Sequence, residues 1–423
     1  MMLRLATLVA ACVLCSTGYA QEKTVLTLDE AFARVAGAHP ELRLIDARGD
    51  GIATELERAA FRPPLVLGAE IENALGTGDA SGLSAAEATF SLASVLERGG
   101  KLQARQALAQ RRIDALAGEH EAKRLDLLAE VARRYLAAAA ALHQQSIAER
   151  DIAQRQRTVA GAKQRLRAGA SPESVVLTAQ AALARAELEH ARALQQHADA
   201  RRHLAALWGE RAPAFQVSAT DPTRLPDIAG FDVLVQLLDR NPDLLRFASE
   251  QRIGEARLQL ARSQGSADLD WEVGIRHLHA TDDVALVAGI SIPLGTRTRA
   301  QPDTRAAQAE LVALEIEREA REWSLHSTLA DAHGRYSVVK LEVERLRGDI
   351  IPKLVRAEQA AERAYRAGAI SYLEWAQLQS DTTSARKQQL EAALDAHRAL
   401  IEIQRLIGDP FIVATHATQE TIP

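Results

Sequence analysis

Residues 167–209 read RAGASPESVVLTAQAALARAELEHARALQQHADARRHLAALWG, and two interleaved sets of residues recur in them every seven positions. The first set is Val176, Leu183, His190, His197 and Leu204, and the second, three residues later each time, is Ala179, Ala186, Ala193, Ala200 and Leu207. A seven-residue repeat is typical of a coiled coil, and alanine at one position lets two backbones approach closely. The pattern predicts a long helix packed against another helix.

The partner helix is expected just before the RAGA segment. Residues 98–167 contain no proline and consist mainly of Ala, Leu, Arg, Glu and Gln, which favour helix. At 1.5 Å per residue this helix would extend on the order of 100 Å. Gly169 separates it from the helix expected at 172–208, and glycine readily adopts the left-handed conformation that ends a helix. We therefore expect an antiparallel helical hairpin that turns at Gly169.

The motifs return in the same order about 200 residues later, which predicts a tandem duplication. HPEL at 39–42 returns as NPDL at 241–244, and RAGA at 167–170 returns at 366–369. The expected units are a first repeat at 21–209, a proline-containing linker at 210–230, a second repeat at 231–409 and a tail at 410–423.

The second repeat is expected to form its own hairpin. Its helices are predicted at about 300–366 and 371–407, with the turn at Gly368. Pro352 lies inside the first of these helices and is expected to break or kink it.

Four short segments alternate between apolar and polar residues, as strands do. They lie at about 65–74, 87–96, 268–278 and 284–293, and each has the length of a tilted strand that crosses a membrane. Four strands are too few to close a barrel around a pore, so closure would need several chains. A small periplasmic sheet that caps the helices is the alternative. The polar face carries five acids, which would favour cations if it lined a pore: Glu70, Glu72, Glu87, Asp270 and Glu272.

Composition excludes several classes of function. The 423 residues include only 4% aromatics, so the core must be built largely from Ala, Leu and Val in closely packed helices. The formal net charge is −5, so no overall basic field would attract nucleic acid. We find no glycine-rich phosphate loop, GxSxG or HExxH motif, and no histidine set with metal-ligand spacing. The sequence therefore predicts neither an enzyme nor a bound cofactor or metal.

The N-terminus is typical of a secretory signal. Arg4 precedes an apolar stretch, and small residues at Gly18 and Ala20 fit a cleavage site, so we expect a signal peptide at 1–20. Lipidation of Cys12 is the alternative for this segment. After it, no run approaches the 18 apolar residues of a membrane-spanning helix, so a membrane could be crossed only as a β-barrel.

Together these motifs resemble the TolC-type outer-membrane efflux proteins and, within them, the CzcC-like heavy-metal branch. The resemblance covers nearly all of the chain after the signal segment. It rests on LTLDEA at 26–31 with HPEL at 39–42, on the strands around 86–89 and 284–294, and on the two RAGA turns.

The resemblance implies a mainly α fold with a small β part, made of long antiparallel coiled-coil hairpins. Each chain would contribute four strands to a trimeric, 12-stranded transmembrane β-barrel and four helical arms to a periplasmic α-barrel tunnel. It also implies an RND-type pump in the inner membrane and a periplasmic adaptor, in the envelope of a Gram-negative bacterium.

The resemblance also assigns roles to particular residues. Glu374 matches the first of two acidic positions at the tunnel aperture, and Gln377 stands at the second; an ordinary solvated helix face is the alternative. The residues expected to contact the adaptor could equally be simple helix caps: Arg167, Gly169, Ser171, Arg366, Gly368 and Ser371.

The expected function is therefore that of a passive exit duct in the outer membrane, with divalent heavy-metal cations as substrates. An exit duct for organic compounds or type I secretion is one alternative. A periplasmic coiled-coil structural protein without a pore is another.

Overall fold

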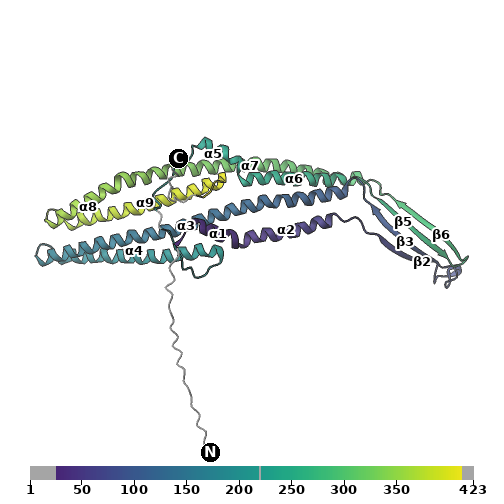
Figure 1. The fold of residues 1–423 in the computed structure, drawn as a ribbon, viewed down its shortest axis with the longest axis horizontal. Helices are drawn as coiled ribbons and strands as arrows, with labels where there is room; N and C mark the ends of the chain where they lie inside the picture. Colours follow the sequence, from purple (N-terminus) through teal and green to yellow (C-terminus); the bar gives the residue numbers. More distant parts are fainter. Residues whose placement is uncertain (1–24, 219–220, 412–423) are drawn as a thin grey trace, which may run out of the picture.

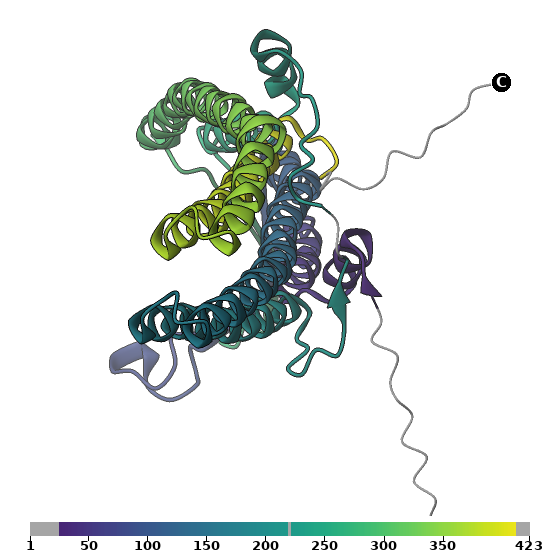
Figure 2. The ribbon, with the colours of Figure 1, turned by 90° about the vertical axis from the view of Figure 1, so that its left-hand side faces the viewer.

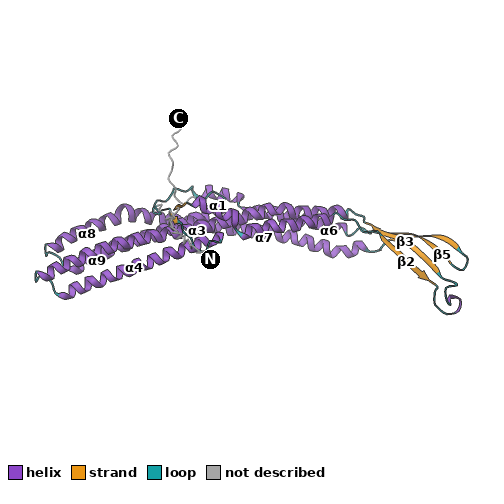
Figure 3. Cartoon of the chain, turned by 60° about the horizontal axis from the view of Figure 1, so that its bottom comes forward, coloured by secondary structure: helices purple, strands orange, loops and turns teal. Residues whose placement is uncertain are grey.

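The computed structural model describes residues 25–218 and 221–411. The expected signal segment with Cys12 and nearly all of the tail lie outside these residues. The described chain is an elongated body of long helices with a four-stranded sheet at one end (Figures 1 and 3). Seen from the opposite end, which carries the hairpin turns, the helices form a curved wall rather than a closed ring (Figure 2).

The first hairpin consists of α3 (Lys101–Arg167) and α4 (Glu173–Ala205). The alanines of the heptad pattern lie in its seam: Ala179, Ala186 and Ala193 are each at most 3% exposed. Their small side chains allow the close helix contact that the repeat predicted. The core is accordingly rich in alanine and leucine, and its aromatic residues are few.

The first arm of the second hairpin is not one continuous α-helix. This arm consists of α7 (Thr296–Arg345), a π-helical turn at Leu346–Ile350 and α8 (Ile351–Arg366), and the second arm is α9 (Tyr372–Ile407). Pro352 stands in the first turn of α8. Proline cannot donate a backbone hydrogen bond and its ring crowds the preceding turn, so the regular α-helical pattern is interrupted just before it.

Two shorter helices extend the hairpins toward the sheet: α2 (Pro40–Ala59) and α6 (Pro242–Ser263). Each begins at the proline of its HPEL or NPDL motif, a favoured position because the missing N–H would be unpaired there anyway. Most of the remaining short elements lie around the middle of the body: β1 (Val25–Leu26), which pairs in parallel with β4 (Gln216–Val217), and the helices α1 (Leu28–Ala38), η2 (Ala206–Trp208), α5 (Phe231–Leu237) and η3 (Leu238–Arg240). The short helix η1 (Gly78–Ala80) lies instead at the sheet end of the body.

The sheet contains two antiparallel strands from each repeat. Its order is β2 (Val66–Glu72), β3 (Glu87–Leu96), β5 (Leu269–Leu278) and β6 (Asp283–Ser291). The pairing of β3 with β5 joins the two repeats. Because β2 and β6 have no further neighbour within the described chain, the sheet is open at both edges.

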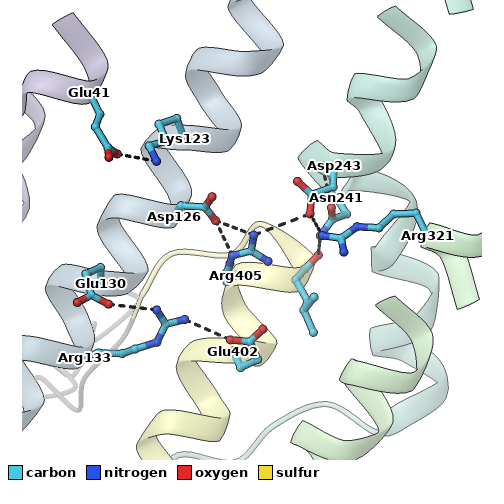
Figure 4. A network of polar contacts seen from close by, with 11 residues as sticks. Glu41, Lys123, Asp126, Glu130, Arg133, Asn241, Asp243, Arg321, Glu402 and Arg405 are labelled. Carbon is cyan, nitrogen blue, oxygen red and sulfur yellow. Dashed lines mark hydrogen bonds and ion pairs between the residues drawn. The ribbon is translucent and has the colours of Figure 1, made fainter. Parts of the chain in front are cut away.

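Charged side chains tie the repeats together at the middle of the body (Figure 4). Arg405 of α9 lies 2.6 Å from Asp126 of α3 and 3.8 Å from Asp243 of α6. One turn away, Arg133 of α3 binds Glu402 of α9 at 3.2 Å. These contacts hold α9 of the second repeat against α3 of the first, so the two hairpins are positioned relative to each other.

Candidate functional site

The two hairpin turns have the same backbone geometry. Gly169 and Gly368 have φ values of +68° and +80°, the left-handed conformation expected for glycine at a helix end. In both turns the residue after the glycine donates a backbone hydrogen bond to the helix, from Ala170 to Arg165 at 2.9 Å and from Ala369 to Ala364 at 2.8 Å. Each turn is therefore closed by its own backbone hydrogen bonds, and both glycines are exposed at the end of the body.

A contact that sequence reasoning did not find joins the two turns. The Nη1 of Arg165 donates to the carbonyl oxygen of Tyr365 at 2.5 Å, and its guanidinium lies 4.9 Å from the centre of the Tyr365 ring. The Tyr365 ring in turn packs 5.1 Å from that of Trp375. Arg165 therefore links the end of α3 to the end of α8, and its partner Tyr365 belongs to an apolar cluster that includes Val176.

The residues expected at the adaptor contact differ in their surroundings. Arg167 is exposed, whereas Arg366 forms an ion pair with Glu362 at 2.5 Å. Ser371 caps the N-terminus of α9, whereas Ser171 precedes Pro172, the cap residue of α4, which makes no side-chain cap hydrogen bond. The two turns are thus alike in backbone and different in side chains.

Glu374 has a clear local partner. Its carboxylate accepts hydrogen bonds from the backbone N–H of Ser371 at 2.7 Å and from the Ser371 hydroxyl at 2.9 Å, which completes a capping box. These bonds, the backbone one first, lower the pKa of Glu374 below its ordinary value. The side chain is nevertheless exposed, so its charge remains available to ions in solution.

Gln377 contacts an acidic residue, Asp381, that sequence reasoning missed. Its amide nitrogen donates to the carboxylate of Asp381 at 2.7 Å, one turn further along α9. Within a single chain, Glu374, Gln377 and Asp381 form a row along one helix and enclose nothing. An aperture could arise only if several copies brought their rows together.

Further along the hairpins, a buried polar network connects α3 with α9. Thr158 and Gln379 exchange hydrogen bonds of 3.0 and 3.1 Å. Arg155 donates to Ser380 at 3.1 Å and is held by Asp151 at 3.2 Å. Such satisfied polar groups fix one packing arrangement of the two helices, because an unpaired polar group would be costly there.

The strand register brings all five predicted acids to one face of the sheet. Residues directly opposite each other in antiparallel strands point to the same side. Glu70 lies opposite Thr89, which lies opposite Arg276; Glu72 lies opposite Glu87 in the next rung. The same count along β5 places Asp270 and Glu272 on this face.

The other face of the sheet is apolar and exposed. Leu67, Phe90, Val273 and Leu286 lie on it and are 46–79% exposed. A sheet with one charged face and one uncovered apolar face suits a strand assembly between water and lipid.

Within residues 25–218 and 221–411, no helix combines the length and apolar character needed to span a bilayer. Nor do three or more His, Cys, Asp or Glu side chains gather there in a metal-binding arrangement.

The model of the outer membrane efflux protein family matches residues 46–210 and 233–409, one segment for each repeat. The chain belongs to this family. It is therefore an outer-membrane protein whose helical hairpins lie in the periplasm, and the two matched segments agree with the internal duplication.

Individual proteins give the same result. The cobalt-zinc-cadmium resistance protein CzcC of Cupriavidus metallidurans is 25% identical over 383 residues, which cover 90% of each chain. The pyoverdine export outer membrane protein OpmQ of Pseudomonas putida is 26% identical over 76% of this chain and 70% of its own. The crystal structure of CusC, described in terms of transmembrane channel formation, superposes with a TM-score of 0.74 at 18% identity, covering 90% of this chain and 92% of CusC. These relatives are described by resistance, export or channel formation and not by an enzymatic reaction.

Proposed function

We propose that three copies of the chain close into one channel, the passive exit duct of a tripartite efflux system. The duct would receive substrate from an RND-type pump in the inner membrane through a periplasmic adaptor. Divalent heavy-metal cations are the proposed substrates. The observation that carries this proposal is the two-faced sheet with unpaired edges, which needs further strands to become complete.

The two unpaired edge strands of the sheet explain why several copies would close into a barrel. Exposed backbone groups on β2 and β6 require partners, because unpaired N–H and C=O groups are not tolerated inside a bilayer. Pairing β6 of one copy with β2 of the next satisfies them. The apolar face would then contact lipid, and the acidic face would line the lumen.

The hairpin turns are proposed to meet the adaptor, through Arg167, Gly169 and Ser171 and through their second-repeat counterparts. They lie at the end of the body opposite the sheet, which is the end that would face the inner membrane (Figure 1). Around Gly169 nothing lies within 4 Å of the place where a Cβ would stand, so a partner could approach the backbone closely.

The aperture is proposed to lie at the first turns of α9. Three copies of Glu374 would bring like charges together and favour cations over anions. The capping role of Glu374 does not conflict with this, because its side chain remains exposed at the helix surface.

Two observations favour metal cations as substrates. The similarity to CzcC extends over nine-tenths of both chains, and the polar sheet face is acidic. The similarity to OpmQ, an exporter of pyoverdine, favours organic compounds as the second candidate. Deleting the gene from its host separates them: metal transport predicts sensitivity to zinc, cobalt, cadmium or copper, restored by the plasmid-borne gene. Unchanged metal tolerance with loss of export of an organic compound would contradict the metal proposal.

A periplasmic coiled-coil protein without a pore is a poorer fit, because it would leave the apolar face of the sheet in water. Membrane fractionation tests this. The channel predicts a heat-resistant trimer in the outer-membrane fraction, whereas a structural rod predicts a monomer in the soluble periplasmic fraction.

A further inference from the structure

Arg276 of β5 contacts two other strands at once. Its Nη2 lies 3.0 Å from the carboxylate of Glu72 on β2, and its Nη1 lies 2.9 Å from that of Glu87 on β3. Its Nε donates to the hydroxyl of Thr89 at 3.0 Å. All three nitrogens of the guanidinium therefore have a partner on the polar face of the sheet.

No other arginine or lysine occurs within the four described strands. By the strand register, Arg276 shares its face with six carboxylates: Glu70, Glu72, Glu87, Asp270, Glu272 and Asp283. The formal charge of this face is therefore −5 per chain, and replacing Arg276 with a neutral residue would make it −6.

The acids fall into two groups along the strands. Glu72, Glu87 and Asp283 share the rung at the end away from the helices, and Glu70 shares the next rung with Arg276. Asp270 and Glu272 lie at the other end, nearest the helices. Within the described residues, neither Asp270 nor Glu272 has an ion-pair partner, so their charge is not neutralised in this way.

We propose that Arg276 limits the cation selectivity of the channel. This rests on the proposed function, since it requires the polar face to line a conducting lumen. By pairing with Glu72 and Glu87, Arg276 offsets their charge at the outer end of the strands. The preference for cations then comes mainly from Asp270 and Glu272 near the helices.

Reversal potentials in planar bilayers test this with the purified, heat-resistant oligomer in a KCl gradient. R276Q is expected to raise the K⁺/Cl⁻ permeability ratio roughly 2- to 5-fold in dilute salt, and the effect should shrink near 1 M salt, where screening acts within about 3 Å. R276K keeps the charge and loses the forked geometry. It should therefore keep the wild-type ratio while lowering the temperature at which the oligomer dissociates.

Two further variants neutralise acidic residues and leave Arg276 unchanged. E72Q/E87Q leaves Arg276 without its ion-pair partners and should shift the ratio toward anions. D270N/E272Q should lower the cation preference of the wild-type channel.

An assembled R276Q channel with the wild-type ratio would overturn the proposal. If R276Q does not assemble, an unchanged ratio in E72Q/E87Q would overturn it instead. Failure of the wild-type protein to conduct would refute the proposed function itself and this inference with it. If the wild-type channel conducts and selects cations but its permeability ratio is unchanged by R276Q, this inference alone is refuted.

Discussion

Asn241 binds the ends of two helices with one side chain. Its Nδ2 donates to the carbonyl oxygen of Leu406 at 2.7 Å, at the end of α9, and its Oδ1 accepts from the N–H of Asp243 at 2.8 Å, at the start of α6. The side chain is 1% exposed. Asn241 therefore joins the end of α9 to the start of α6. It also pairs backbone groups at these helix ends that have no partner within their own helix.

Replacing Asn241 with alanine should destabilise the protein by about 2–4 kcal/mol, because it removes an N-cap and leaves a buried carbonyl unpaired. Denaturant unfolding of the detergent-solubilised protein, followed by circular dichroism, measures this. His39 is the matched control: it caps α2 through one longer bond of 3.3 Å to Glu41, and H39A should cost about 1 kcal/mol or less. Equal losses for the two variants would contradict the two-helix role of Asn241.

Arg165→Ala should loosen the contact between the hairpin turns. The variant loses the bond to Tyr365, so amides at the end of α8 and the start of α9 should exchange hydrogen several-fold faster. Arg167→Ala, two residues away at an exposed site, is the control and should leave exchange unchanged. If these amides exchange as slowly in R165A as in the native protein, the contact between Arg165 and Tyr365 does not stabilise the turn.

The first turn of α9 should weaken in acid. The pKa of Glu374 is lower in the folded protein than its ordinary value of 4.5. The stability that its carboxylate adds to this turn is therefore fully present above pH 4.5. The contribution is lost as the pH falls through the lower, folded pKa. Hydrogen exchange in this turn, corrected for its intrinsic pH dependence, should therefore accelerate below about pH 4.5. E374Q should remove that acceleration, and persistence of the acceleration in E374Q would assign it to another group.

The same residue offers a test of the aperture. E374Q should lower cation selectivity in bilayers, whereas S371A, which removes the cap hydroxyl and keeps the charge, should not. Loss of selectivity in both variants would point to altered helix structure, and loss in neither would exclude Glu374 from the conducting path.

Bulky residues at Gly169 and Gly368 should abolish adaptor-dependent efflux while the oligomer survives. Both glycines have positive φ, where a side chain costs about 1–2 kcal/mol, a small loss for a large assembly. Alanine at the same positions is the control for backbone strain and should retain more activity than leucine. Normal resistance in cells that make wild-type amounts of the double leucine variant would contradict the adaptor role.

Local signals in the sequence account for much of the fold. The helical hairpins follow from proline-free, alanine-rich segments that end at RAGA turns, and the glycines there have the expected conformation. The alternation within β2, β3 and β5 predicted which residues of each strand share a face, because side-chain direction in a strand has a period of two. The strand register confirms that the five acids lie on one face of the sheet.

Local sequence patterns did not predict contacts between residues that are far apart in the chain. The pairing of Arg276 with Glu72 depends on the register of β3 against both neighbours, and the Arg165–Tyr365 contact depends on how two hairpins pack. The capping box of Ser371 and Glu374 is different: the S-x-x-E spacing was visible in the sequence and would have identified it.

Disulfide cross-linking between the edge strands tests most directly whether several copies close the sheet. The 423 residues contain cysteine only at positions 12 and 15, so a cysteine at Glu70 of β2 can be combined in turn with one at Ala285, Val287 or Gly289 of β6. In outer membranes treated with a mild oxidant, at least one pair should give covalent dimers and trimers and nothing larger. Monomers alone for every pair, or a ladder continuing beyond the trimer, would contradict the closed three-copy channel.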